Sequence, residues 1–278
     1  MNLAASYKQV RQAVVAFAPK ITPPGTHPFE FVFGTGFIVA DSVIATNRHV
    51  AECFDTYPDG KVVAIVFVRR PNGMVMVLLD VTNAVIIENI VQPKIYYGPD
   101  RPDVALVSVA CTGLLPLAVK LNVDCAAEGE AIATAGFPMG HHLLHLEGQF
   151  DHVSPTLQGG IVSAVLPFPD PTVTHGYLIN VMVQGGASGS PVFLQETGEV
   201  IGAVYASRLD INRAPINFTH VVPSHFLATV LAECETNLMQ FVPQDAPMLS
   251  EIIETIPTGE MEQKMIQGEH KHRRNGDD

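Results

Sequence analysis

Residues 184–191 read QGGASGSP and place two serines among three glycines just ahead of an apolar run. Such a stretch is either a plain tight turn or a backbone bent to present one serine as a nucleophile. Acyl transfer by a serine requires a base, a carboxylate that orients the base, and two backbone N–H donors for the developing oxyanion. Ser188 is the candidate nucleophile, and the N–H groups of Gly186 and Ser188 are the candidate donors. Glycine at position 186 permits backbone conformations that other residues resist.

A base and a carboxylate lie upstream of this serine. His49 follows an apolar run at the point where a strand is expected to end, and Asp103 stands at the start of another apolar run. Burial against His49 would keep the Asp103 carboxylate ionised through hydrogen bonding. Asp100 is the alternative carboxylate, but it precedes an Arg-Pro pair, which is typical of an exposed loop. The three side chains together favour the catalytic interpretation of the glycine-rich stretch over the plain turn.

The elements that must position these residues are mostly strands. Short runs rich in Val and Ile recur between turn residues, and helical periodicity is limited to residues 6–13 and 223–233. We expect an all-β fold of two packed six-stranded antiparallel Greek-key barrels with a C-terminal helix. The expected segments are an N-terminal segment 1–27, a first barrel 28–120 with His49 and Asp103, a second barrel with the terminal helix 121–235 that carries Ser188, and a polar, flexible tail 236–278 with one short helix.

Composition excludes several classes of protein. The 278 residues carry a formal net charge of −12, which argues against nucleic-acid binding, and 47% of them are hydrophobic, as expected of a packed core. No apolar run approaches the roughly 20 residues of a membrane-spanning helix, and no export signal is visible. We therefore predict no membrane association and a cytoplasmic location, or export if a leader is missing. The four cysteines form no CxxC pair, so buried free thiols without a metal or cofactor are expected.

Three histidines lie together in the stretch GHHLLHLEG, at positions 141, 142 and 145. The spacing of His141 and His145 would suit a zinc site on a helix. Flanking glycines favour a loop instead, so we predict no metal site. We expect His220 and His225, which flank the last strand and the terminal helix, to be structural.

Six motifs occur in an order that resembles the chymotrypsin-like serine proteases, and most closely the HtrA (Deg) type. They are GTGFIV (34–39), ATNRHV (45–50), DVALV (103–107), GGIVSA (159–164), GGASGSPVF (185–193) and GEVIGAVYA (198–206). The resemblance spans residues 30–230 and implies a trypsin-like fold. It also implies a serine endopeptidase in which Ser188 attacks, His49 is the base, Asp103 orients His49, and Gly186 and Ser188 form the oxyanion hole.

The resemblance further implies how a polypeptide substrate binds. Val204, Tyr205 and Ala206 would pair with the backbone of an extended or unfolded substrate, by β-augmentation. Met182, six residues before the nucleophile, and the adjacent Val183 would line the pocket for the P1 side chain. An apolar Met182 would favour a small or medium apolar side chain, although Met182 could instead be a core residue.

The sequence also departs from the HtrA pattern. Too few residues follow the terminal helix for a PDZ domain. HtrA relatives are commonly trimers, so a homo-oligomer is expected from the resemblance alone. Two other interpretations stay open: a latent or inactive peptide-binding module with a protease fold, and a hydrolase of small esters or amides. The natural substrate and the resting state of the oxyanion loop are also open.

Overall fold

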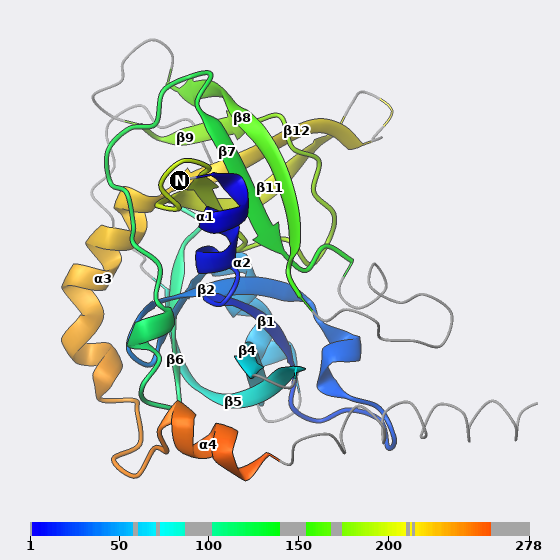
Figure 1. The fold of residues 1–278 in the computed structure, drawn as a ribbon, viewed down its shortest axis with the longest axis vertical. Coiled ribbons are helices and arrows are strands. Elements are labelled where there is room, and N and C mark those ends of the chain that lie inside the picture. The colour runs from blue at the N-terminus through cyan, green and yellow to red at the C-terminus, as the bar shows by residue number, and fades with distance from the viewer. Residues whose placement is uncertain are drawn as a thin grey trace, which may run out of the picture.

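Twelve antiparallel strands form two closed barrels of six strands each (Figure 1). The structure is a computed structural model that describes residues 2–57, 61–70, 73–86, 102–139, 154–167, 174–209, 212 and 215–256. The first barrel has the strand order β1-β2-β3-β6-β5-β4, in which β4 closes onto β1. Its strands are β1 (Val14–Pro19), β2 (Gly34–Ala40), β3 (Val43–Thr46), β4 (Val62–Arg70), β5 (Gly73–Ile86) and β6 (Ala105–Val109).

The second barrel repeats this topology. Its order, β10-β11-β12-β9-β8-β7, matches that of the first barrel when every number is raised by six, and β10 closes onto β7. In both barrels a fourth strand returns beside the first, which is the Greek-key connection. The predicted fold class is therefore confirmed. The strands are β7 (Ala131–Gly136), β8 (Thr156–Leu166), β9 (Gly176–Ile179), β10 (Pro191–Leu194), β11 (Val200–Leu209) and β12 (Pro215–Pro223).

The first barrel begins earlier than residue 28, the boundary expected from the sequence. Strand β1 lies inside the segment 1–27 and pairs with both β2 and β4. All six residues of β1 are buried, so its sequence VVAFAP shows no alternation of apolar and polar residues. A strand buried on both faces is hard to distinguish by periodicity from an apolar turn of helix, which explains why this strand was not predicted.

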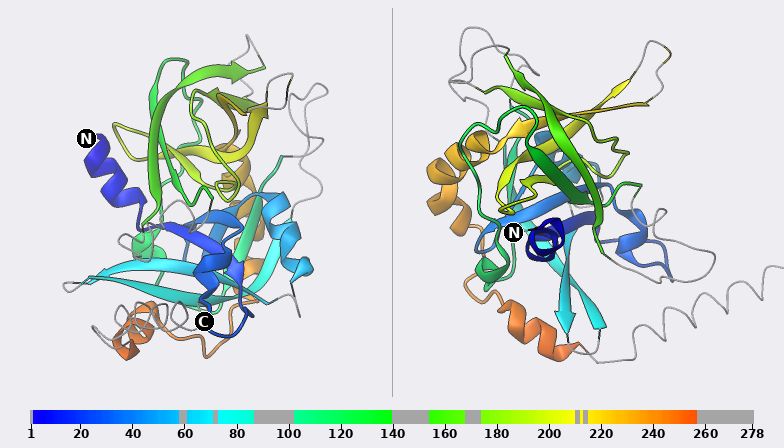
Figure 2. Two further views of the ribbon diagram at one scale, coloured as in Figure 1. Left: turned by 90° about the vertical axis from the view of Figure 1, so that its right-hand side faces the viewer. Right: turned by 45° about the horizontal axis from the view of Figure 1, so that its top comes forward.

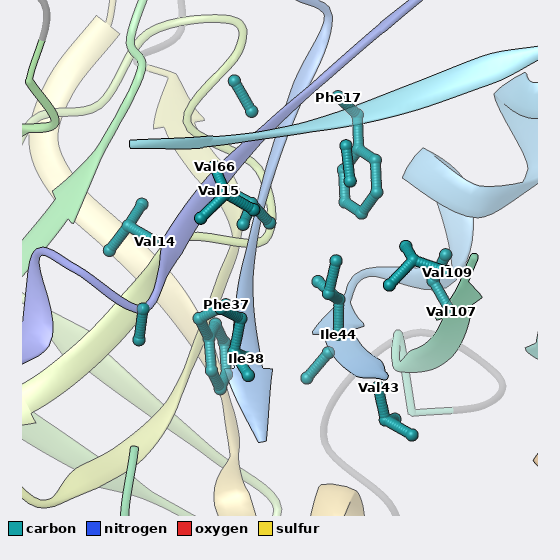
Figure 3. Packing of buried hydrophobic residues seen from close by; sticks show 14 of the residues in the cluster. Val14, Val15, Phe17, Phe37, Ile38, Val43, Ile44, Val66, Val107 and Val109 are labelled. Carbon is teal, nitrogen blue, oxygen red and sulfur yellow. The ribbon is translucent and has the colours of Figure 1, made fainter. Parts of the chain in front are cut away.

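Branched aliphatic and aromatic side chains fill the first barrel. Figure 3 shows Phe17 from β1 and Ile44 from β3 on one side of β2, together with valines from β4 and β6, and Phe37 from β2 on the opposite face of its own strand. Each of the three named side chains is fully buried. Close packing of this kind holds the ends of β3 and β6 in a fixed register, and these ends carry the predicted base and carboxylate.

An aromatic cluster lies where the two barrels meet. Phe29 and Phe67 belong to the first half of the chain, and Phe137 follows β7 of the second barrel. The Phe137 ring lies 5.8 Å from Phe29 in an edge-on arrangement and 5.1 Å from Phe67, and all three side chains are buried. These contacts, and the view in Figure 2 of one barrel stacked on the other, describe a single packed unit.

Helices bind the two barrels together at the periphery. Helix α1 (Leu3–Val10) begins and ends three residues earlier than the helical stretch predicted at 6–13, and its Ser6 hydroxyl donates to the Gln195 carbonyl of the second barrel at 2.7 Å. Helix α3 (Ser224–Met239) packs along both β6 and β11 (Figure 1). Ser224 is the first helical residue of α3, and its hydroxyl donates to the Asn122 carbonyl. None of the helices in the described ranges is long and apolar enough to span a membrane.

The first part of the predicted flexible tail is folded. Helix α3 continues to Met239, and helix α4 (Leu249–Thr255) packs beside the first barrel. Thr112 forms a parallel bridge with Met248, and its carbonyl accepts the Leu249 N–H at 2.8 Å. The segment therefore adds a short strand-like contact that its polar composition did not indicate. The rest of the tail, residues 257–278, lies outside the described residues.

Candidate active site

His49 sits where β3 ends and a short helix begins. Helix α2 (Arg48–Glu52) follows Asn47, whose extended backbone (φ −80°, ψ 153°) marks the transition from strand to helix. The His49 side chain is 44% exposed. The ring is therefore anchored by a strand end of the packed barrel and remains accessible to a ligand.

Asp103 meets His49 because β3 and β6 are paired neighbours. Thr46 of β3 lies opposite Ala105 of β6, which places the two side chains just beyond the paired residues. Asp103 Oδ2 lies 2.6 Å from His49 Nδ1, and Oδ1 accepts the His49 backbone N–H at 3.0 Å. Asn47 Nδ2 also donates to the Asp103 carbonyl oxygen at 2.9 Å.

The contact with Asp103 determines the protonation pattern of the His49 ring. An ionised carboxylate can only accept a hydrogen bond, so Nδ1 must carry the proton in the neutral ring. Nε2 is then the unprotonated nitrogen and can accept a proton. Asp103 is only 6% exposed, so its hydrogen bonds are shielded from water. Asp100, the alternative carboxylate, lies outside the described residues.

The glycine-rich stretch folds into two consecutive tight turns. The Ala187 N–H donates to the Gln184 carbonyl at 3.1 Å, and the third residue of this turn is Gly186, with φ 89°. The Ser190 N–H donates to the Ala187 carbonyl at 3.0 Å, and the third residue is Gly189, with φ 86°. A positive φ at the third position is the mark of a type II turn and favours glycine. Both glycines are therefore required by the backbone.

These turns orient the two candidate donor groups. In a trans peptide the C=O and N–H point in opposite directions. The Gly185 carbonyl accepts the Met139 N–H at 2.6 Å, and the Ala187 carbonyl accepts the Ser190 N–H. The N–H groups of Gly186 and Ser188 consequently face away from these partners. No backbone carbonyl in the described ranges accepts either of them.

The two serines of the stretch differ in access. Ser188 is half-buried at the second position of the second turn. Ser190 is 1% exposed and packs against β7, where a Cβ added at Gly136 would lie 1.9 Å from its hydroxyl oxygen. Only Ser188 is accessible to a ligand.

The nucleophile loop is tied to the His49 strand by a short chain of hydrogen bonds. The Ser188 carbonyl accepts the Thr35 N–H of β2 at 2.9 Å. The Thr35 carbonyl in turn accepts the Thr46 hydroxyl at 2.7 Å, three residues before His49. Through Thr35 the packing of the barrels places Ser188 and His49 in one region.

Strand β11 continues past its neighbour β10. Strand β10 pairs with β11 as far as Ala203, and Val204 is then engaged by the loop, donating to the Ser190 carbonyl and accepting the Gly189 N–H. Of the three residues expected to pair with substrate, Val204 is thus already hydrogen-bonded within the protein. Tyr205 and Ala206 follow as half-buried residues on a segment that pairs with β12.

Met182 lies beside the paired strands β11 and β12, which hold the residues on either side of it. The Thr219 hydroxyl donates to the Val181 carbonyl at 2.5 Å, and the Ser207 hydroxyl donates to the Val183 carbonyl at 2.8 Å. The Met182 side chain is 44% exposed, which excludes the alternative that it is a core residue. Val183 is 6% exposed, so its side chain belongs to the second-barrel core.

The remaining candidates lie elsewhere. His141, His142 and His145 fall outside the described residues. Within the described part of the chain, no group of three or more His, Cys, Asp or Glu side chains could hold a metal ion. All four cysteines are free, but the expectation that they are buried holds only for Cys111, where burial raises the pKa of the thiol to about 11. Cys125 is exposed.

Two site residues were not identified from the sequence. Asn47 and Thr35 both lie inside motifs that were noted for their resemblance, ATNRHV and GTGFIV, but neither side chain was assigned a role. Their polarity within or directly after an otherwise apolar strand was an available signal, because a buried polar side chain needs a partner. The partner itself could not be identified from spacing.

Comparison with known proteins identifies the family of the chain and agrees with its fold. Residues 34–202 match the family model of the trypsin-like peptidase domain. Among solved structures, the serine endoprotease from Yersinia pestis is similar with a TM-score of 0.55 at 18% identity, over 86% of this chain and 67% of that one. The HtrA-type protease AlgW with a tripeptide is similar with a TM-score of 0.54 at 16% identity, over 84% of this chain and 64% of its own. The chain thus spans about two thirds of the length of these proteins.

Proposed function

Because this chain belongs to the trypsin-like peptidase family, which makes it a serine endopeptidase, we propose that Ser188, His49 and Asp103 are its catalytic residues. The observation that carries the assignment is the His49–Asp103 pair at 2.6 Å, with the ring exposed and the carboxylate buried. The substrates are peptide bonds in extended or unfolded polypeptides.

The reaction proceeds through an acyl-enzyme. Ser188 Oγ attacks the scissile carbonyl carbon while His49 Nε2 takes the hydroxyl proton, and Asp103 stabilises the resulting imidazolium. The oxyanion accepts hydrogen bonds from the N–H groups of Gly186 and Ser188. The C–N bond then breaks, and the leaving amine takes the proton from His49. Water, deprotonated by His49, then attacks the acyl carbon, the ester bond to Ser188 Oγ breaks, and His49 returns the proton to Ser188 Oγ as the carboxylic acid leaves.

The orientation of the loop supports an oxyanion hole that exists before substrate binds. Both donor peptides already have their carbonyl oxygens engaged, at Gly185 and Ala187, on the side opposite the N–H groups. Donors arranged before the reaction need no reorganisation as the negative charge develops.

An extended substrate would add to β11 as a further strand. The candidate edge is Ala206, beyond the point where β10 stops pairing. Backbone hydrogen bonds of this kind provide affinity without regard to side chains, so unfolded segments would bind better than folded surfaces. The exposed Met182 side chain would line the P1 pocket and favour a small or medium apolar residue.

A fluorophosphonate probe tests the proposal. We expect labelling of the wild type and none of Ser188→Ala, while Ser190→Ala keeps its label because that serine is buried. Cleavage of unfolded casein and of a simple ester should be compared in the same preparations. Failure of the folded wild type to label, with casein present, would favour a peptide-binding module, and turnover of the ester alone would indicate a small-molecule hydrolase.

The assembly and the location of the protein stay predictions. A trimer rests on the resemblance to HtrA proteases alone, and sedimentation velocity would measure it. The cytoplasmic location rests on the sequence and requires fractionation of cells that express the protein.

A further inference from the structure

Thr35, in the first barrel, forms four hydrogen bonds around the nucleophile loop of the second barrel. Its N–H donates to the Ser188 carbonyl at 2.9 Å, and its hydroxyl donates to the Gly186 carbonyl at 2.7 Å. The same hydroxyl oxygen accepts the Phe137 N–H at 3.2 Å, and the Thr35 carbonyl accepts the Thr46 hydroxyl at 2.7 Å. The residue is completely buried, so none of these bonds is shared with water.

Thr35 holds the carbonyls of the loop that do not belong to the two donor peptides. The peptides that begin at Gly185 and Ala187 supply the candidate oxyanion donors, and Met139 and Ser190 hold their carbonyls. Thr35 holds the other two carbonyls, that of Gly186 between the donor peptides and that of Ser188 directly after them. Since consecutive planar peptides share a Cα atom, the rotation of one is coupled to the orientation of the next. Releasing the Gly186 carbonyl would therefore loosen both donor peptides.

Packing leaves little freedom at this contact. A Cβ added at Gly189 would lie 2.0 Å from the Thr35 carbonyl oxygen, and one added at Gly136 would lie 3.3 Å from the Thr35 hydroxyl oxygen. Two glycines thus allow the strand and the loop to approach closely. Because Phe137 N–H occupies the hydroxyl oxygen as a donor, the hydroxyl proton is directed to the Gly186 carbonyl.

We propose that the Thr35 hydroxyl is a positioning group that holds the nucleophile loop in the shape that binds the oxyanion. Thr35 acts through the Gly186 and Ser188 backbone and does not touch the reacting atoms. The inference rests on the proposed function, since it matters only if Ser188 is the nucleophile. A positioning role for Thr35 makes formation of the oxyanion hole depend on docking of the first barrel against the second.

The test replaces the hydroxyl with a methyl group of similar size. In Thr35→Val the Gly186 carbonyl loses its donor, and we expect kcat for a peptide substrate to fall about 10- to 100-fold, somewhat less than the loss of a whole oxyanion donor. The KM should change less than about threefold. The inhibition constant of a peptide boronic acid, which forms the tetrahedral oxyanion, should rise in parallel with the fall in kcat/KM. Thr35→Ser retains the hydroxyl and should restore kcat to within about threefold of wild type.

Thr134 offers a matched control in the neighbouring strand β7. It is 3% exposed, and its hydroxyl has no hydrogen-bond partner in the part of the chain that the structure describes. Thr134→Val should therefore leave kcat and boronic-acid inhibition unchanged. If Thr35→Val does not fold, Thr35→Ala, which cannot overfill the site, replaces it in the same comparison.

The outcomes separate the two proposals. An unchanged kcat per folded molecule in a hydroxyl-free variant, in an otherwise active enzyme, would overturn the positioning role, as would loss of kcat in Thr35→Ser equal to that in Thr35→Val. A wild type that neither cleaves peptides nor reacts at Ser188 would overturn the proposed function instead. Loss of kcat with matching loss of boronic-acid affinity supports the inference.

Discussion

The buried carboxylate of Asp103 engages His49 twice, through the ring nitrogen Nδ1 at 2.6 Å and through the backbone N–H at 3.0 Å. One contact fixes the tautomer of the ring, and the other fixes the backbone from which the ring extends. An asparagine at 103 keeps the shape of the side chain but can present its amide N–H₂ to Nδ1, which would stabilise the wrong tautomer.

We therefore expect Asp103→Asn to lower kcat on the order of 10⁴-fold while the protein stays folded. Steady-state kinetics and circular dichroism measure the two quantities. Asp55→Asn, at an exposed position of the same barrel, is the control and should retain full activity. A loss of less than about tenfold in Asp103→Asn would remove Asp103 from the catalytic set.

Gly189 has both a positive φ and a close backbone contact, and Gly129 has only the positive φ. A Cβ at Gly189 would lie 2.0 Å from the Thr35 carbonyl oxygen, but none of the described atoms comes within 4 Å of a Cβ at Gly129. Gly129→Ala should reduce the free energy of unfolding by about 1–2 kcal/mol, the cost of the left-handed conformation. Gly189→Ala should cost about 2–5 kcal/mol, because overpacking is added. Urea denaturation measures both, and equal losses would contradict the close contact.

Met182 should determine the preference for the substrate side chain at P1. Met182→Asp places a negative charge in the proposed P1 pocket, so cleavage after Lys or Arg should improve relative to apolar residues by about tenfold or more in kcat/KM. Profiling on a peptide library measures this ratio. Met74→Asp introduces the same charge at an exposed position of β5 and should leave the profile unchanged. An unchanged profile in Met182→Asp would place the P1 pocket elsewhere.

His27 should make the stability of the first barrel sensitive to acid. Its ring nitrogen Nδ1 accepts the Phe29 N–H at 3.1 Å in the cap of the 3₁₀ helix η1 (Pro28–Phe31), and burial lowers the pKa of the ring below 6.5 despite the opposing effect of Glu30. The unfolded chain then binds a proton at a higher pH than the folded protein does. The stabilising contribution is complete above pH 6.5 and is lost as the pH falls through the lower folded-state pKa.

The free energy of unfolding of the wild type should consequently decrease between pH 7 and pH 5. That of His27→Asn should decrease less over the same range, since asparagine caps a helix without titrating there. Urea denaturation at a series of pH values measures the two slopes. Burial also lowers the pKa values of His175 and His225, so a smaller acid dependence should remain in the variant. Identical slopes for the wild type and His27→Asn would exclude a contribution from this cap.

Strand positions were predictable where one face of the strand meets solvent or a turn residue bounds it. Two of the apolar runs read as strands, KVVAIVFVRR (61–70) and AIATAGF (131–137), form β4 and β7, each within one residue at its start and end. Strand β1 was missed because it is buried on both faces, lacks the alternating pattern, and follows residues 11–13 with no turn residue to mark its start. The contact of α4 with Thr112 was missed because the segment is polar. A polar segment can nevertheless be ordered by a few backbone hydrogen bonds to a distant part of the chain.

The sequence by itself determined which residue types were available for chemistry and in what order, because a serine between glycines, a histidine after a strand and an aspartate before one are local features. Tertiary structure alone decided their partners. The contact of His49 with Asp103 joins residues 54 positions apart, and that of Thr35 with Gly186 joins residues 151 positions apart. The first contact forms when β3 pairs with β6, and the second forms only when the two barrels pack against each other, since the position of each group depends on the register of strands that are distant in the chain.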